Sequence, residues 1–223
     1  MKISLCHQRV RGLTLVELLV VIAVLCIFAA MIDFGTPMHA KSRALRIQCV
    51  NNLKQIGLAT RVWEGDHGEK YPWSIPGTNG GTMEFVTGPN VWRHFQVMSN
   101  ELSTPKVVIC PADDDLHSAV ATNFNFFSNS NLSFFIGLGA SNSDPQSLLS
   151  GDRNITNATP IKNGILALTT NNPAGWTAEI HNKVGNIVLA DGSVQQVSRT
   201  GLQDAFVNAH GSTNHLQMPV LAP

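Results

Sequence analysis

The sequence predicts an α+β fold, in which a long N-terminal helix packs on a small antiparallel β-sheet. An apolar run at Leu13–Ile32 contains only two polar residues, Thr14 and Glu17. Helical periodicity continues through residues 41–63, where apolar residues return on one face. Segments rich in strand-forming residues follow Pro160. Because a helix with one apolar face must bury it against another layer, we expect these strands to form a sheet over that face.

The apolar run has the length of a membrane span. Its twenty residues would extend roughly 30 Å as a helix, which is about the thickness of a bilayer's hydrocarbon core. Lys2, Arg9 and Arg11 precede the run, and Asp33 follows it. This asymmetry predicts a single-pass protein with a cytoplasmic N-terminus and the remainder beyond the membrane.

Two simpler interpretations explain the run less well. A cleaved secretory signal has an apolar core of about 7–15 residues, followed by a small-residue cleavage site. Here the apolar residues continue from Leu18 to Ile32, and Ala29-Ala30-Met31 is a poor cleavage site. A plain membrane anchor explains the length but not Glu17, because a carboxylate inside a membrane helix is costly without a partner.

The helical stripe after the run repeats at steps of three and four residues, which places its members on one face. The members are Leu45, Cys49, Leu53, Ile56, Thr60 and Trp63. Arg43, Lys54 and Arg61 fall on the opposite side. We expect one long helix, apolar all round in its first half and amphipathic in its second. It should break near Gly35-Thr36-Pro37 and end near Asp66.

Four segments after Pro160 have the composition of strands. They are Gly164–Leu168, Trp176–Ile180, Asn186–Ala190 and Ser193–Val197. Asp191-Gly192 predicts a hairpin between the last two, with a type I′ turn that needs positive φ at both central residues. Thr200 is expected to cap a short helix after this hairpin. Earlier strands are expected at Val107–Ile109 and Phe124–Phe127.

The residues GLTLVE, Gly12 to Glu17, resemble the processing site of type IV prepilins and type II secretion pseudopilins. In that family a peptidase cuts after the glycine, the new N-terminus is methylated, and the glutamate becomes the fifth mature residue. The resemblance implies a pilin-like fold, cleavage between Gly12 and Leu13, methylation of Leu13, and an assembly role for Glu17. Leu13 stands where the family usually has phenylalanine, so a bulky apolar residue is kept.

Most of the remaining chain resembles a narrower group of pseudopilin-like proteins from planctomycete and verrucomicrobial genomes. Their C-terminal signature is a histidine, nine residues and then Asp-Gly. Here His181 is followed after nine residues by Asp191-Gly192. The segment Lys41–Trp73 and the short sequences VICPAD (Val108–Asp113) and GDRN (Gly151–Asn154) also resemble that group.

These observations divide the chain into four parts. Residues 1–12 are expected to be a prepilin leader, and residues 13–35 a transmembrane and assembly helix. Residues 36–67 continue this helix with an amphipathic half, and residues 68–223 form an exported globular α+β domain. The implied location is the inner membrane, with the C-terminal domain in the periplasm, and then a pseudopilus after processing.

The four cysteines have different surroundings. Cys6 lies in the leader, and Cys26 lies in the apolar run. Cys49 and Cys110 would reach an oxidising compartment, which permits one disulfide between them. Two buried free thiols are the alternative.

Metal ligands are not expected from the sequence. His181 and Asp191 could bind a metal, but Asp-Gly is already explained as a turn, so a structural role is the simpler interpretation. Asp113, Asp114 and Asp115 could bind calcium through carboxylate oxygens. They lack the alternate spacing of a compact calcium loop, so a solvated acidic loop is the simpler interpretation. No other cofactor is expected.

The predicted function is structural rather than enzymatic. The motifs G-x-S-x-G, G-x-x-x-x-G-K-[ST] and H-E-x-x-H are absent. A net charge of zero argues against nucleic-acid binding. A pseudopilin of a type II secretion system fits best, with a prepilin peptidase/methyltransferase, other pseudopilin subunits, inner-membrane secretion machinery and the membrane as partners. A minor type IV pilin for adhesion, motility or DNA uptake and a membrane-anchored surface binding domain are the alternatives.

Overall fold

The computed structural model describes residue 12 and residues 14–33, 37–114, 120–156, 160–169, 174–209 and 213–220. The chain forms two compact units, residues 1–41 and residues 42–223. We call residues 42–223 the C-terminal unit. The predicted leader up to Arg11, the predicted methylation site Leu13 and the calcium candidate Asp115 lie outside the described residues.

Two helices follow one another at the N-terminal end of the chain. α1 spans Leu15–Asp33 and α2 spans Pro37–Asp66. Pro37 opens α2, where proline is tolerated because the N–H of a first helical residue has no intrahelical partner. Gly68 follows α2 with a φ of 69°, the left-handed conformation in which helices commonly end. The predicted end near Asp66 is confirmed, whereas the Gly35-Thr36 part of the predicted break lies outside the described residues.

The predicted stripe of α2 faces the core of the C-terminal unit. Leu45 is half-buried. The fully buried members are Cys49, Leu53, Ile56, Thr60 and Trp63. Gly57 marks the point where α2 packs on the sheet, because a Cβ atom placed there would lie 2.9 Å from Cγ2 of Val188. A glycine at this position lets the helix and the sheet approach closely.

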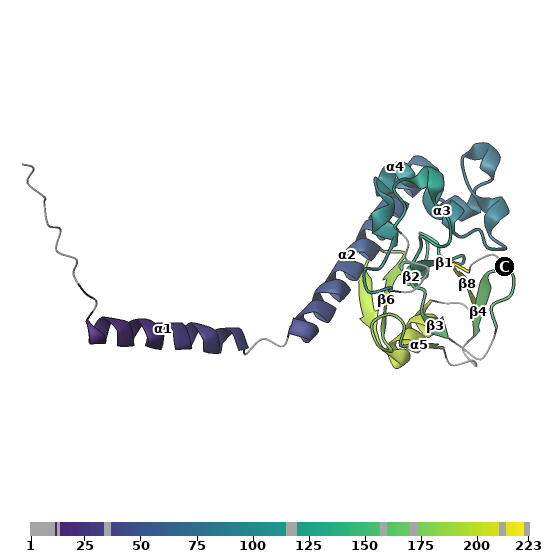
Figure 1. The fold of residues 1–223 in the computed structure, drawn as a ribbon. Helices are drawn as coiled ribbons and strands as arrows, with labels where there is room; N and C mark the ends of the chain where they lie inside the picture. Colours follow the sequence, from purple (N-terminus) through teal and green to yellow (C-terminus); the bar gives the residue numbers. More distant parts are fainter. Residues whose placement is uncertain are drawn as a thin grey trace, which may run out of the picture. The chain divides into compact units, whose positions relative to one another are not determined.

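A six-stranded sheet in the order β4-β8-β1-β2-β6-β7 forms the centre of the C-terminal unit (Figure 1). Its strands are β1 (Phe134–Gly137), β2 (Leu148–Asp152), β4 (Ile165–Thr169), β6 (Gly185–Leu189), β7 (Val194–Val197) and β8 (Thr213–Gln217). A second sheet pairs β3 (Ile155–Thr156) with β5 (Gly175–Trp176). All these pairs are antiparallel. The predicted α+β class is therefore confirmed.

Both faces of the large sheet are covered at its centre. The inner strands β1, β2 and β6 are buried along their whole length, whereas the edge strand β4 alternates between buried and half-buried residues. On one face Phe134 packs in a core that includes Leu53 of α2. On the other face Phe135 packs in a second core that includes Phe206 of α5 (Arg199–Asn208). Successive strand residues point to opposite faces, so β1 supplies both cores.

The two predicted early strands are wrong, because both segments form 3-10 helices. These are η4 (Pro105–Val108) and η5 (Phe124–Phe126). The side chains of Thr104 and Asn123 each accept a hydrogen bond from the N–H two residues later. Such caps satisfy the backbone locally and favour a turn over an extended strand. Other short helices are η1 (Pro72–Ser74), η2 (Gly77–Asn79), η3 (Met83–Phe85), α3 (Trp92–Val97) and α4 (Ser99–Leu102).

Two later boundaries also differ from the prediction. The strand expected at Trp176–Ile180 is limited to β5, and the chain turns after it. The N-cap of α5 is Ser198 rather than Thr200, since the Ser198 hydroxyl accepts a hydrogen bond from the N–H of Gly201 at 3.3 Å. Strands β1, β2 and β8 were not predicted from the sequence.

The predicted hairpin between β6 and β7 is present, but its turn is not type I′. Gly192 has a φ of 84°, whereas Asp191 does not have positive φ. The N–H of Leu189 donates to the carbonyl of Ser193 at 3.0 Å, so Ala190–Gly192 form the loop. A three-residue loop with its last residue in the left-handed region is the glycine-bulge hairpin. Only Gly192, not Asp191, needs the left-handed conformation.

Candidate functional site

The first candidate site is the start of α1. The N–H and the hydroxyl of Thr14 each donate to Oε2 of Glu17 at 2.9 Å. The N–H of Glu17 donates to Oγ1 of Thr14 at 3.3 Å. This reciprocal arrangement is a capping box, in which two side chains satisfy N–H groups that the first helical turn leaves without partners. This local role was not predicted from the sequence, although the spacing Thr-x-x-Glu is its usual signature.

Apolar side chains of α1 are exposed to a degree that is unusual for a folded protein. The exposed fractions of its large apolar residues between Leu15 and Phe28 range from 43% to 78%. Among the residues that the structure describes, no helix has the length and hydropathy required to cross a membrane. The membrane-spanning role of the helix therefore stays a prediction.

Comparison with known families identifies the N-terminal segment. Residues 7–32 match the family model of the prokaryotic N-terminal methylation motif, a range that includes Gly12, Leu13 and Glu17. The chain has a prepilin-type N-terminus. This prepilin-type segment supports a protein like the type IV pilins and pseudopilins, as the first resemblance implied. The match does not reach His181 or Asp191, so the second resemblance stays a prediction. Neither a curated protein nor a solved structure matches the chain.

The second candidate site is a buried cluster of four side chains that can bind metals. Cys49 lies on α2, Cys110 follows η4, Asp152 ends β2, and His181 lies in the turn before β6. One ligand atom from each residue lies within 4.8 Å of all the others. The structure thus brings together the two cysteines that the sequence analysis paired and the histidine of the proposed signature. It also adds Asp152.

Short contacts connect the members of this cluster. The Cys49 thiol donates to Oδ1 of Asp152 at 3.2 Å, and Sγ of Cys110 lies 3.3 Å from Nε2 of His181. Nε2 of His181 lies 3.7 Å from Oδ2 of Asp152. The side chain of His181 is 2% exposed and that of Asp152 is 0% exposed. Both thiols are free in the structure. The predicted disulfide stays a prediction.

Groups around the cluster fix two of its members. Oδ2 of Asp152 accepts hydrogen bonds from the backbone N–H of Asn186 at 2.7 Å and from its side-chain amide at 3.0 Å. The guanidinium of Arg46 donates to the carbonyl of His181 at 2.8 Å. Because both partners come from distant parts of the chain, the positions of Asp152 and His181 depend on the complete fold.

The backbone that carries His181 is strained. His181, Asn182 and Lys183 have φ values of 55°, 53° and 64°. Left-handed conformation costs a non-glycine residue about 1–2 kcal/mol, and such residues normally occur singly. Three in succession persist only where surrounding contacts hold them, and residues of this kind concentrate at functional sites. The strained turn directs the His181 side chain toward the other three residues of the cluster.

Burial also changes the acid–base properties of the cluster. Burial raises the pKa of the Asp152 carboxyl to about 7, although hydrogen bonds from Asn186 oppose the shift. Burial lowers the pKa of His181 to about 4, and the positive charge of Arg46 acts in the same direction. Burial likewise raises the pKa of the Cys49 thiol well above its ordinary value. The imidazole is therefore neutral at physiological pH, which leaves a ring nitrogen able to bind a proton donor or a metal.

Asp113 in the acidic segment after Cys110 does not fit the solvated loop that the sequence suggested. Asp113 is 3% exposed. Its two carboxylate oxygens accept hydrogen bonds from Nε and Nη2 of Arg153 at 2.8 and 2.7 Å. Asp114 is exposed. Both oxygens of Asp113 thus serve a buried ion pair, and the calcium alternative stays a prediction.

The other signature residue, Asp191, lies apart from this cluster in the β6–β7 loop. Its carboxylate accepts a hydrogen bond from the N–H of Ser193 at 2.8 Å. Its carbonyl accepts a hydrogen bond from the guanidinium of Arg61 on α2 at 2.6 Å. Asp191 and Gly192 therefore shape the hairpin and attach it to α2.

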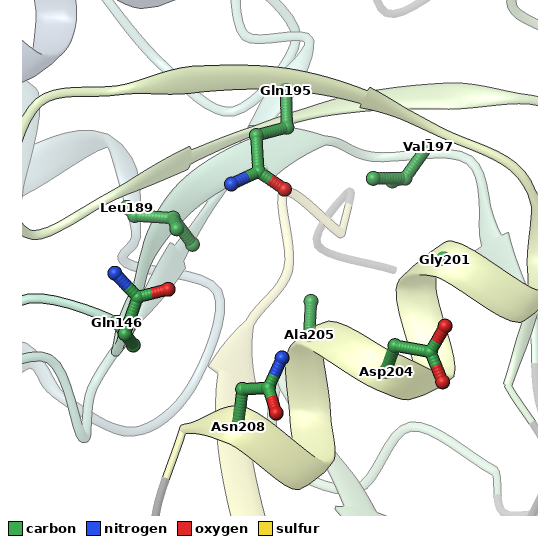
Figure 2. Close-up of a pocket in the computed structure, with 8 residues that line it drawn as sticks. All are labelled: Gln146, Leu189, Gln195, Val197, Gly201, Asp204, Ala205 and Asn208. Atoms are coloured by element: carbon green, nitrogen blue, oxygen red, sulfur yellow. The ribbon is translucent and has the colours of Figure 1, made fainter.

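A small cleft lies between α5 and the β6–β7 hairpin (Figure 2). It is lined by Gln146, Leu189, Gln195, Val197, Gly201, Asp204, Ala205 and Asn208. Figure 2 shows the amides of Gln195 and Asn208 pointing into it from opposite sides. Its volume of about 220 Å³ is below the roughly 300–1,000 Å³ of typical ligand sites. Of the described residues that line the cleft, only Asp204 can ionise, so these residues offer no pair of groups for acid–base chemistry.

Proposed function

We propose that this chain is a pseudopilin subunit of a type II secretion pseudopilus. A prepilin peptidase/methyltransferase cleaves it after Gly12 and methylates Leu13, and the subunit then assembles through α1. Before assembly it resides in the inner membrane with its N-terminus in the cytoplasm and the C-terminal unit in the periplasm. The observation that carries this proposal is the methylation motif at residues 7–32, a range that includes most of α1 and its exposed apolar side chains.

The exposed side chains of α1 require an apolar environment that the described part of the chain does not supply. Burying one large aliphatic or aromatic side chain contributes about 1.5–3 kcal/mol relative to water. Before assembly, the lipid tails would cover these side chains. After assembly, the α1 helices of other subunits would cover them. Because lipid tails are as apolar as leucine, moving from lipid to fibre yields little hydrophobic gain, and packing and polar contacts must determine how subunits fit together.

Glu17 is the polar group placed to determine that fit. In the described chain its carboxylate bonds only to Thr14, one turn away. Cleavage after Gly12 would create a cationic amine at Leu13, which stays cationic after methylation. In a fibre, the amine of one subunit would pair with Glu17 of a neighbour and set the axial register between them. The precursor lacks this amine, so assembly depends on cleavage.

The outer face of α2 offers a second contact surface for neighbouring pseudopilin subunits. Ile47, Leu58 and Val62 are 56%, 64% and 49% exposed. At about 100° per residue, they lie roughly opposite the stripe that packs on the sheet. These residues leave an apolar strip on α2 that the C-terminal unit does not cover, as expected for a helix that also lies inside a fibre.

The experiment separates the two roles of Glu17. Glutamine can replace glutamate in a capping box, so Glu17→Gln keeps the cap and removes the charge. Thr14→Ala removes the cap and keeps the charge, at a cost of about 0.5–2 kcal/mol to the helix start. Both variants are compared with wild type for membrane insertion, for cleavage and for recovery in fibres sheared from cells.

We expect Glu17→Gln to be inserted and cleaved like wild type but to be lost from sheared fibres. Thr14→Ala should still enter fibres. Equal recovery of Glu17→Gln and wild-type protein in fibres would contradict the assembly role. Recovery in surface pili rather than in a pseudopilus would identify a minor type IV pilin. Uncleaved protein that never enters a fibre would identify a membrane-anchored binding domain.

A further inference from the structure

We propose that the C-terminal unit binds a single structural zinc ion through Cys49, Cys110, Asp152 and His181. The proposal is independent of the assembly role above, because none of these residues lies in α1. It replaces the expectation from sequence that the chain binds no metal. The ligands come from α2, the loop after η4, the end of β2 and the turn before β6, so the ion would connect four separate parts of the unit.

The distances between the ligand atoms fit a tetrahedral zinc site. Zinc bonds of about 2.0–2.3 Å place neighbouring ligand atoms roughly 3.3–3.8 Å apart. The cluster has a sulfur–oxygen distance of 3.2 Å, a sulfur–nitrogen distance of 3.3 Å and a nitrogen–oxygen distance of 3.7 Å. No pair of ligand atoms is separated by more than 4.8 Å. Small rotations of the side chains would bring all four atoms to bonding distance.

The donor set favours zinc over the other common cations. Two thiolates and an imidazole suit zinc, whereas calcium and magnesium bind oxygen ligands almost exclusively. Four protein ligands leave no position for water or substrate, so the site is structural rather than catalytic. Both cysteines are buried with 0% exposure, which is typical of a closed site.

The surrounding contacts resemble those that support metal ligands. Ligating carboxylates are normally held by further hydrogen bonds, and Oδ2 of Asp152 accepts two from Asn186. Arg46 holds the carbonyl of His181, at the start of a turn with three successive left-handed residues. A structural ion would account for that strain, because its bond to the imidazole would stabilise the backbone conformation that directs the imidazole toward the thiols.

A disulfide between Cys49 and Cys110 is the main competing interpretation, and it explains less. It would use two of the four groups and leave no role for the approach of Asp152 and His181. A carboxylate with 0% exposure is costly to bury without a strong partner. A zinc ion would supply the buried Asp152 carboxylate with a cationic partner. It would also explain the strained backbone of His181, because the imidazole would bind the ion.

The first test uses the full-length chain in detergent, purified without air, chelator or reductant. Zinc is measured by elemental mass spectrometry, and thiol alkylation is followed peptide by peptide. We expect about one zinc ion per chain, with Cys49 and Cys110 protected from alkylation until a chelator is added. Protection that only a reductant removes, with no bound metal, would establish the disulfide and overturn the proposal. Alkylation without either reagent would establish free thiols and overturn it equally.

Variants that keep both thiols provide the second test. Asp152→Asn and His181→Gln should lose stoichiometric zinc, although each could still form a disulfide. Asn186→Ala, which alters only the support of Asp152, should weaken zinc binding about 10–100-fold in chelator competition. Cys26→Ser and His215→Gln are matched controls outside the cluster and should keep the ion. Full zinc binding by both ligand variants would contradict the proposal.

A third measurement uses wild-type protein, so it tests the site even if the ligand variants fail to fold. Wild-type protein reloaded with cobalt(II) should show the intense visible absorption of tetrahedral cobalt together with a thiolate charge-transfer band. A weak spectrum without the thiolate band would overturn the assignment of the cysteines as ligands.

Discussion

In α1, large apolar side chains between Leu15 and Phe28 reach exposures of 43–78%, whereas Phe134 and Phe135 in the sheet of the C-terminal unit are fully buried. The polar groups differ in the same way. Glu17 bonds to a residue three positions away, but Asp152 bonds to Cys49 and Asn186, which are distant in sequence. The C-terminal unit thus buries a core of its own and connects distant polar groups within it, whereas α1 leaves its apolar groups for an external environment.

Breaking the buried ion pair should have the largest effect on the C-terminal unit. Arg153→Met leaves the Asp113 carboxylate, whose side chain is 1% exposed, without its bidentate partner. The loss of one member of a buried pair costs about 3–5 kcal/mol. Chemical unfolding with a chelator present measures this loss without a contribution from metal. The control Lys54→Met, at an exposed position of α2, should stay within about 0.5 kcal/mol. Similar midpoints for the two variants would refute the importance of this pair.

Two leucines on α2 lie on its inner and outer faces. Leu53 is 0% exposed and Leu58 is 64% exposed. Leu53→Ala should lower the free energy of unfolding by about 2–5 kcal/mol, because it opens a cavity in the core. Leu58→Ala should change it by no more than about 0.5 kcal/mol but should reduce recovery in fibres. If both variants were destabilised alike, α2 would have no separate outer surface.

His94 gives the C-terminal unit a smaller, pH-dependent contribution. Its buried ring contacts Thr82 and Gln217, each at 2.6 Å, and burial lowers its pKa to about 4. The unfolded value is about 6.5, so the unfolded chain binds the proton first as the pH falls. Stability should therefore drop by roughly 3 kcal/mol between pH 6.5 and 4. His94→Gln should remove this part of the pH slope. An unchanged slope in that variant would show that His94 does not titrate in this way.

Some elements of this fold could be predicted from local sequence patterns. The stripe of α2 and the β6–β7 hairpin follow from periodicity and from one Asp-Gly pair, which are visible in short windows of sequence. The strands β1 and β2 were missed because both of their faces are buried, so they lack the alternation that marks a half-exposed strand. The capping residues Thr104 and Asn123 turned two apolar segments into 3-10 helices that composition alone could not distinguish from strands.

The two candidate sites differ in the same respect. The proposed processing motif is contiguous, so Gly12, Leu13 and Glu17 could be picked out directly from the sequence. The buried cluster combines Cys49, Cys110, Asp152 and His181, whose separations in sequence carry no recognisable ligand spacing. The cysteine pair and the signature histidine were noticed separately. Only the fold shows that they meet Asp152.

The most direct test of the account is the mass of the mature N-terminus. Under the proposed function, α1 is exposed because the chain is a subunit precursor that is processed next to Gly12 before it assembles. Protein recovered from membranes of its native host should begin at Leu13 and carry one added methyl group. An intact Met1, or a new N-terminus after Ala30, would contradict the account.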